Sequence, residues 1–176
     1  MKKTFLLVLM IGLLIAGCDG PKNKETAETI NLEESISLQE DKVFNSNNNR
    51  LNKQDATILM NLYEKYADQN PDDSLSAEYL FRASDISMNL QKPMQTIQFF
   101  NRILTEYPDF KKAPVVLFLK AFVYEDQLRD YKNAKKYYEL FLTKYPESEF
   151  ADDAEVSLKN LGKSPEELIL EFESKQ

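Results

Sequence analysis

The chain has 176 residues and a formal net charge of -7 at neutral pH, with no histidine, no tryptophan, one cysteine and four glycines. An acidic chain without an arginine-rich stretch repels phosphate backbones, which argues against nucleic-acid binding. The shortage of glycine argues against phosphate-cradling loops, and the lack of histidine removes the commonest general base and a common zinc ligand. We therefore expect a helical protein that is not an enzyme and has no metal or cofactor site.

A short apolar segment follows a basic start. Met1-Lys2-Lys3 is basic, and Phe5–Ile15 is apolar but too brief for an ordinary membrane span. It leads into Ile15-Ala16-Gly17-Cys18, which resembles the lipobox of a bacterial lipoprotein signal peptide. The resemblance implies that residues 1–17 are removed and that a covalent lipid is attached to Cys18. The alternative is an ordinary secretory signal followed by a free cysteine.

The same resemblance implies a lipid-anchored protein of the envelope of a Gram-negative bacterium. Asp19 resembles the enterobacterial signal for retention in the inner membrane, but other phyla read the residues after the cysteine differently. We expect the outer membrane rather than the inner one. No second long apolar run follows Ile15, so the sequence predicts no further membrane span.

Residues 18–52 are expected to form the lipidated cysteine and a flexible tether. The segment is polar, contains Asn45-Ser46-Asn47-Asn48-Asn49 and has no sustained apolar period. As a random coil it would have a reach of roughly 30 Å. The alternative is that its apolar residues dock on the folded body as a short helix; these are Ile30, Leu32, Ile36 and Leu38, or Val43 and Phe44.

From Lys53 onward apolar residues recur with the helical period, which predicts an all-α domain over residues 53–176. Five stripes indicate five helices; they comprise Leu59, Leu62, Tyr63 and Tyr66; Leu75, Tyr79, Ala83, Ile86 and Leu90; Ile97, Phe100, Ile103 and Leu104; Val116, Leu117, Ala121, Tyr124 and Leu128; and Ala134, Tyr138, Phe141 and Leu142. Two shorter helices are predicted at Ala151–Leu161 and Pro165–Phe172. Asp130 is the expected N-cap of the fifth helix, and Ser164 with Glu167 forms the expected capping box of the last.

The sequence repeats itself. Tyr107-Pro108-Asp109 recurs as Tyr145-Pro146-Glu147, 38 residues later. A related tripeptide, Asn70-Pro71-Asp72, lies 37 residues before Tyr107-Pro108-Asp109. At the offset of 38, five further pairs match; they are Leu80 with Phe118, Ala83 with Ala121, Leu90 with Leu128, Phe100 with Tyr138, and Ile103 with Phe141. Proline ends each second helix, and each helical pair leaves an apolar face that the next pair covers.

These positions resemble the tetratricopeptide repeat. The matching residues are Ala83, Phe100 and Pro108 in the first unit, and Ala121, Tyr124, Ala134, Tyr138 and Pro146 in the second. The first unit departs where Ile86 replaces the aromatic residue and Thr96 the alanine, and the period exceeds the usual length of about 34 residues. The resemblance implies a tetratricopeptide-repeat α-solenoid of about two full repeats, at residues 72–108 and 109–146, with a C-terminal cap at 147–172.

Long repeats closed by Tyr-Pro-acidic turns look like those of cell-envelope tetratricopeptide lipoproteins. That group includes the outer-membrane assembly lipoprotein BamD, the accessory protein of the Tol-Pal system and small lipoproteins of Bacteroidota. The resemblance implies a protein–protein interaction scaffold, in outer-membrane assembly or in division. Two alternatives are a small glycan-binding lipoprotein and an envelope hydrolase that uses a carboxylate pair.

We expect the partner to bind a concave groove beside the packing stripe of each first helix. The candidate groove residues are Leu80, Ser84, Ser87, Met88, Phe118, Phe122 and Glu125. The alternative is that Phe118 and Phe122 are covered by the predicted helix Ala151–Leu161 or by the tether. Because about two repeats are marginal for an array, either a homo-oligomer or a permanent partner is also expected.

Overall fold

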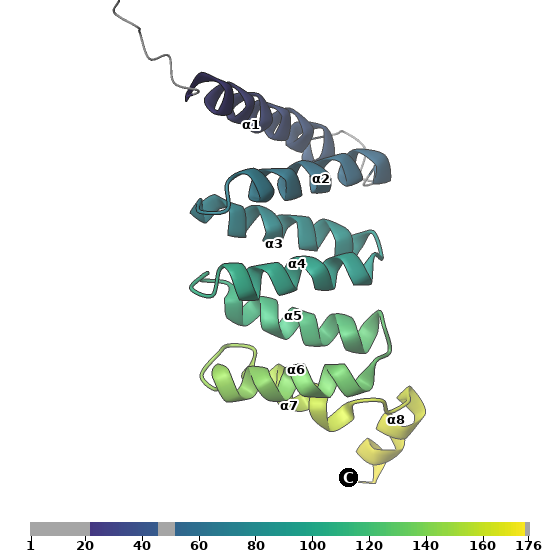
Figure 1. Ribbon diagram of the computed structural model, residues 1–176. Helices are drawn as coiled ribbons and strands as arrows, with labels where there is room; N and C mark the ends of the chain where they lie inside the picture. Colours follow the sequence, from purple (N-terminus) through teal and green to yellow (C-terminus); the bar gives the residue numbers. More distant parts are fainter. Residues whose placement is uncertain (1–21, 46–51, 175–176) are drawn as a thin grey trace, which may run out of the picture.

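The computed structural model describes residues 22–45 and 52–174, and in these ranges all regular secondary structure is α-helical. The helices are α1 (Lys22–Phe44), α2 (Lys53–Gln69), α3 (Ser74–Asn89), α4 (Pro93–Glu106), α5 (Ala113–Asp126), α6 (Tyr131–Lys144), α7 (Ala151–Asn160) and α8 (Pro165–Glu173). From α1 to α7 each helix packs on its neighbours in sequence, and the stack runs from α1 at one end to α8 at the other (Figure 1). The predicted fold class, an all-α array of helical hairpins, is confirmed.

Side-chain caps set several helix starts. Asn52 accepts hydrogen bonds from the backbone N–H groups of Gln54 and Asp55, and Asp130 accepts one from that of Asn133. The expected capping box is present: Ser164 accepts from the N–H of Glu167, whose carboxylate accepts from the N–H of Ser164. These contacts satisfy backbone donors that the first helical turn leaves unpaired.

The turns within the hairpins also repeat. Gln91 joins α3 to α4 with a φ of 57°, and Arg129, which lies 38 positions later, joins α5 to α6 with a φ of 53°. A left-handed conformation is unusual for residues other than glycine, so its recurrence at the same offset marks equivalent turns. The hairpins α3–α4 and α5–α6 lie within the predicted repeats 72–108 and 109–146.

Two groups of buried side chains hold the array together. The larger group extends from Leu32 of α1 to Val123 of α5, and the smaller joins α5, α6 and α7 through residues such as Ala121, Ala134 and Phe141. Small residues let the helix backbones approach, while aromatic rings fill the space between layers. Each fully buried aromatic or aliphatic side chain contributes roughly 1.5–3 kcal/mol to folding.

The expectation of a flexible tether is wrong for residues 22–44. They form α1, which packs on α2 and buries Leu32, Ile36 and Val43, as the docking alternative proposed. Leu38 and Phe44, which that alternative also named, are exposed. The array therefore begins with a third hairpin, α1–α2, where the sequence predicted only a single preceding helix.

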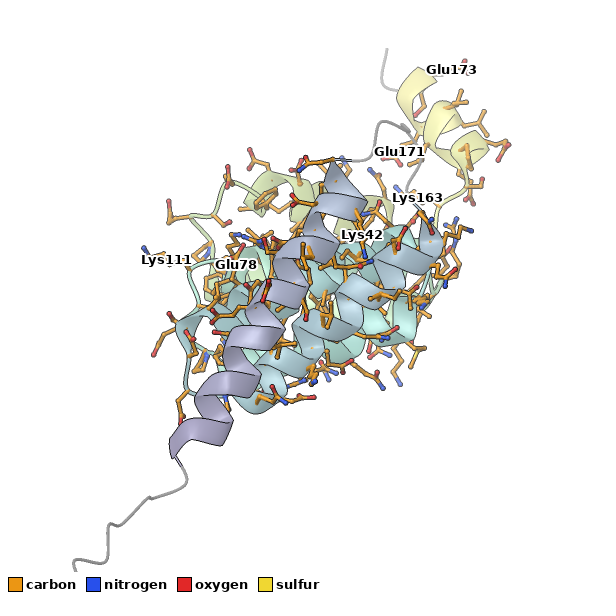
Figure 2. The ribbon with its side chains drawn as sticks, turned by 90° about the horizontal axis from the view of Figure 1, so that it is seen from above. Lys42, Glu78, Lys111, Lys163, Glu171 and Glu173 are labelled. Carbon is orange, nitrogen blue, oxygen red and sulfur yellow. The ribbon has the colours of Figure 1, made fainter. Side chains whose placement is uncertain are left out.

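The C-terminal helix contrasts with the rest of the stack. Figure 2 shows α8 projecting beyond Lys163, with Glu171 and Glu173 on it. Lys163 donates to Glu171 across the turn, and Leu168, Ile169 and Leu170 are all exposed. Within the described ranges, no helix combines the length and apolar character needed to cross a membrane.

Candidate partner-binding surface

The predicted groove residues of α3 are not accessible. Leu80, Ser84 and Ser87 are fully buried, and the Ser87 hydroxyl lies 2.8 Å from the Thr96 hydroxyl of α4. This stripe therefore faces α4 inside the hairpin. The prediction is wrong because helix positions i, i+3, i+4 and i+7 share one face, so these residues lie on the same packing stripe as Ala83.

The matching residues of α5 are largely used in packing. Phe118 stacks on Phe150 at the start of α7, with ring centroids 5.2 Å apart, and also contacts Tyr138 of α6. Glu125 accepts a hydrogen bond of 2.8 Å from the Tyr138 hydroxyl. Only Phe122, at 38% exposure, is open to solvent. The alternative in which packing covers both rings is therefore correct for Phe118 and wrong for Phe122.

The remaining predicted residues take structural positions. Met88 is half-buried, and its carbonyl accepts a hydrogen bond from the Gln127 side chain. Of the repeat signature, Ala83, Phe100, Ala121, Ala134 and Tyr138 are buried, Tyr124 stacks on Tyr137, and Pro108 and Pro146 are exposed in turns. Cys18 and the expected signal peptide lie outside the described residues.

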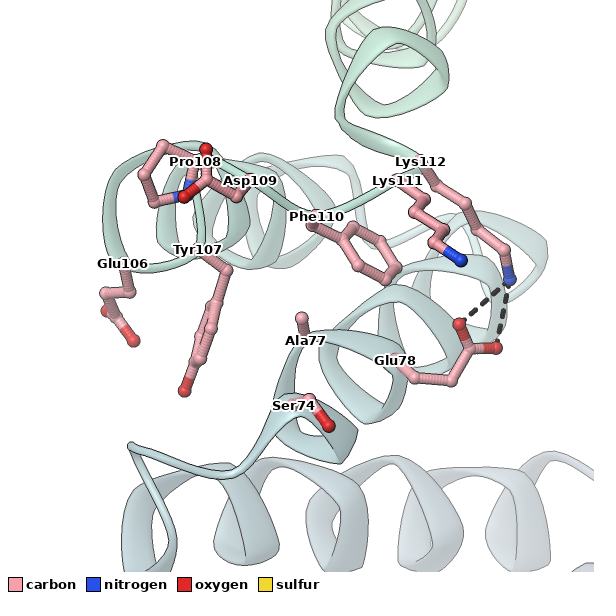
Figure 3. A pocket seen from close by; sticks show the side chains of 10 residues that line it. All are labelled: Ser74, Ala77, Glu78, Glu106, Tyr107, Pro108, Asp109, Phe110, Lys111 and Lys112. Carbon is pink, nitrogen blue, oxygen red and sulfur yellow. Dashed lines mark hydrogen bonds and ion pairs between the residues drawn. The ribbon is translucent and has the colours of Figure 1, made fainter.

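A cleft lies elsewhere on the array. It has a volume of about 540 Å³ and opens where the α4–α5 connection passes the first turns of α3 (Figure 3). Its lining consists of Ser74, Ala77 and Glu78 from α3, and Glu106, Tyr107, Pro108, Asp109, Phe110, Lys111 and Lys112 from the end of α4 and the connection. The sequence indicated Tyr107-Pro108-Asp109 as a helix stop and a repeat marker, so its place in a cleft was missed.

The centre of the cleft is apolar. Tyr107 and Phe110 lie on either side of Ala77 in Figure 3. The carbonyl of Tyr107 accepts from the N–H of Phe110, and the carbonyl of Phe110 accepts from the N–H of Ala113, so two successive turns fix the loop. The Phe110 ring also contacts Phe81 of α3, at a centroid distance of 6.2 Å. The aromatic walls are therefore held in place before anything binds.

Charged side chains surround this apolar centre. Lys112 donates to both carboxylate oxygens of Glu78, at 3.0 and 2.9 Å, and its Nζ lies 4.7 Å from the centroid of the Phe81 ring. Burial alone would raise the pKa of the Glu78 carboxyl, but the bonds from Lys112 and Arg82 hold it below its usual value. Glu78 is therefore ionised at neutral pH, while Asp109 and Lys111 are exposed at the rim.

The ion pairs at the cleft continue to α1. Arg82 contacts Glu78 at 3.4 Å and donates to Glu40 of α1 at 2.9 Å. Glu40 also accepts a hydrogen bond of 2.5 Å from the buried Tyr63 hydroxyl. A series of ion pairs, from Lys112 through Glu78 and Arg82 to Glu40, thus connects the cleft with α1.

A shallower cleft occupies the equivalent place one repeat later. It has a volume of about 390 Å³ and is lined by Pro114, Lys144, Tyr145, Pro146, Glu147 and Ser148. Both clefts are built from a Tyr-Pro turn and the start of the preceding first helix. They are therefore a property of the repeat, and they follow one edge of the array.

The described residues include no group of three or more histidine, cysteine or carboxylate side chains placed to hold a metal ion. Residues 115–148, which cover most of α5, all of α6 and the turn after it, match the family model of the tetratricopeptide repeat. Among curated proteins, no significant match to the chain is found. The matched segment, which lies within the stack of helical hairpins, is thus similar to a tetratricopeptide repeat, a motif whose arrays mediate protein–protein interactions.

Proposed function

We propose that this protein is a lipid-anchored adaptor of the bacterial cell envelope that binds a segment of a partner protein in the cleft between α3 and the α4–α5 connection. The cleft is the observation that carries the proposal. Its volume of about 540 Å³ falls within the range typical of ligand sites, and a few charged groups surround an apolar centre. Such a site suits an apolar side chain of a peptide flanked by polar groups.

The anchor rests on the sequence around Cys18. Only residues 19–21 separate this cysteine from α1, and α1 is 23 residues long. Helix α1 therefore replaces most of the segment that the sequence predicted as a flexible tether. Replacing Cys18 with serine should abolish incorporation of labelled palmitate; incorporation equal to that of the wild type would contradict the anchor.

Within the envelope, we propose that the protein is anchored in the outer membrane. We also propose that it acts in outer-membrane assembly or in division. These choices rest on the resemblance of the Tyr-Pro-acidic repeats to those of envelope lipoproteins. Separation of the two membranes on a density gradient decides the first choice. The identity of the captured partner decides the second.

A matched pair of variants tests the cleft. Ser74→Trp places a large ring at the cleft, whereas Glu155→Trp places the same ring on an exposed position of α7. Both proteins should fold, and cross-linked envelopes should yield the partner with the wild type and with Glu155→Trp. Recovery should fall at least tenfold with Ser74→Trp. Equal recovery with both variants would show that the partner does not use this cleft.

A further inference from the structure

A buried lysine lies between α4, α5 and α6 without a counter-charge. Lys120 of α5 is 5% exposed, and its Nζ donates to Asn101 of α4 at 2.6 Å and lies 3.9 Å from the centroid of the Tyr137 ring of α6. Among the described residues, no carboxylate pairs with Lys120. Burying an ammonium group without a counter-charge costs free energy. The chain has more acidic than basic residues, so carboxylates that could pair with Lys120 are plentiful.

Lys120 lines a cavity of about 200 Å³. Leu104, Tyr137 and Leu140 form apolar walls, and Lys144 supplies a second ammonium group from α6. Lys144 is exposed and has no carboxylate partner within the described ranges, and Leu140 is 39% exposed. The cavity thus offers two cationic groups beside an aliphatic surface.

One segment of the chain has the complementary chemistry. Helix α8 carries Glu166, Ile169, Leu170 and Glu173 at i, i+3, i+4 and i+7, which places them on one face. All four are exposed, with Ile169 at 58% and Leu170 at 65%. This face presents aliphatic side chains between two carboxylates, and α8 projects from the stack (Figure 2).

The two surfaces do not meet within one chain. The turn before α8 lies at the start of α6, because a Cβ atom at Gly162 would be 3.5 Å from the Tyr131 ring. The cavity lies near Lys144, at the other end of a 14-residue helix that is about 20 Å long. We propose that this cavity is a carboxylate-binding site whose occupant is α8 of a second copy of the chain.

Reciprocal exchange of α8 gives a two-fold dimer with two such contacts. The carboxylates of α8 pair with Lys144 and Lys120, and Ile169 and Leu170 cover Leu140 and Tyr137. This contact is separate from the α3–α5 cleft, so the Ser74→Trp variant should leave it unchanged.

Cysteine pairing tests the contact directly in the lipidated chain. One tagged copy carries Leu140→Cys and a differently tagged copy carries Leu170→Cys, and both are expressed together and oxidised in intact envelopes. A disulfide forms only when the Cα atoms come within about 7 Å, so we expect a cross-linked product that bears both tags. Val156→Cys on α7, which is 57% exposed, replaces Leu140→Cys as the control and should give none.

Charge variants then test the chemistry of the site. Lys120→Met and Lys144→Glu should each lower the cross-linking yield at least tenfold, and Glu166→Lys should restore the yield in Lys144→Glu. In monomeric protein, Lys120→Met should leave the melting temperature unchanged or raised, because removal of an unpaired buried charge relieves a cost. Absence of the two-tag product, or equal yields in the charge variants, would overturn the proposal. Capture of a different protein by Leu140→Cys would overturn α8 as the occupant.

Discussion

The α5–α6 hairpin and helix α1 are held in the array by different kinds of contact. The hairpin is closed by fully buried apolar groups such as Ala121, Ala134 and Phe141. Among the described side chains of helix α1, the buried apolar ones are Leu32, Ile36 and Val43, and polar side chains add further contacts. Gln39 donates to the backbone carbonyl of Asp55, and Glu40 accepts from Tyr63 and Arg82.

This difference bears on stability and motion. Apolar burial contributes in proportion to the area removed from water, whereas a hydrogen bond exchanged with water contributes only about 0.5–1.5 kcal/mol. Segments with few buried apolar contacts open at lower free energy than the core. We therefore expect α1 to detach from α2 before the α5–α6 hairpin unfolds.

The largest effect is expected from breaking the hairpin. Phe141→Ala removes a fully buried ring that contacts Phe118 and Tyr145, and should lower the free energy of unfolding by about 3–5 kcal/mol in a urea titration. Leu140→Ala, at the neighbouring half-exposed position, is the control and should cost less than about 0.5 kcal/mol in monomeric protein. Similar losses in the two variants would contradict the apolar account of the hairpin.

A smaller and more local effect is expected at α1. Tyr63→Phe removes one hydrogen bond to Glu40, which keeps Arg82 as a partner, so the cost should be about 1–2 kcal/mol. Amide hydrogen exchange should rise in α1 and stay unchanged in α6. The exposed Tyr131→Phe should alter neither helix. Faster exchange across the whole array would show that α1 is not a separate unit.

Loss of the side-chain cap at the start of α2 should lower the free energy of unfolding by a smaller amount. Asn52→Ala leaves the N–H groups of Gln54 and Asp55 without their acceptor and should lower the free energy of unfolding by about 1 kcal/mol. Asn52→Asp keeps an acceptor and should retain the wild-type stability. A loss of the same size in both variants would indicate that the side chain does not act as a cap.

The smallest effect is expected in the pH dependence of the melting temperature. The pKa of Glu78 is lowered in the folded state. Its contribution to the free energy of unfolding is therefore complete above the unfolded-state pKa and is lost as pH falls through the folded-state pKa. Glu78→Gln should therefore flatten the fall in melting temperature on acidification below about pH 4.5. Identical pH profiles for the variant and the wild type would show that the Lys112 and Arg82 pairs do not stabilise the fold.

Much of the array could be predicted from sequence. The helical period from Lys53 onward, the prolines after Tyr107 and Tyr145, and the caps at Asp130 and Ser164 are local signals, and the helices they predict are present. Helix α1 was harder to predict because its apolar pattern is weak and its polar side chains find partners on other helices.

The candidate site depended on tertiary geometry. The predicted groove failed because Leu80, Ser84 and Ser87 belong to the packing stripe, where serine hydroxyls bond to neighbouring groups instead of solvent. The cleft joins the start of α3 to a loop some 30 residues later along the chain. Periodicity within one helix carries no information about such a contact, although the recurring Tyr-Pro turn marked one of its walls.

The most direct test of the adaptor account is site-specific photo-crosslinking in living cells. A photoreactive amino acid replaces Asp109 at the rim of the cleft, or the exposed Asp153 on α7 as the control. We expect one reproducible protein cross-linked from position 109, absent from position 153 and lost when Ser74→Trp fills the cleft. No cross-linked protein at position 109, or the same protein from both positions, would contradict the claim that this cleft binds the partner.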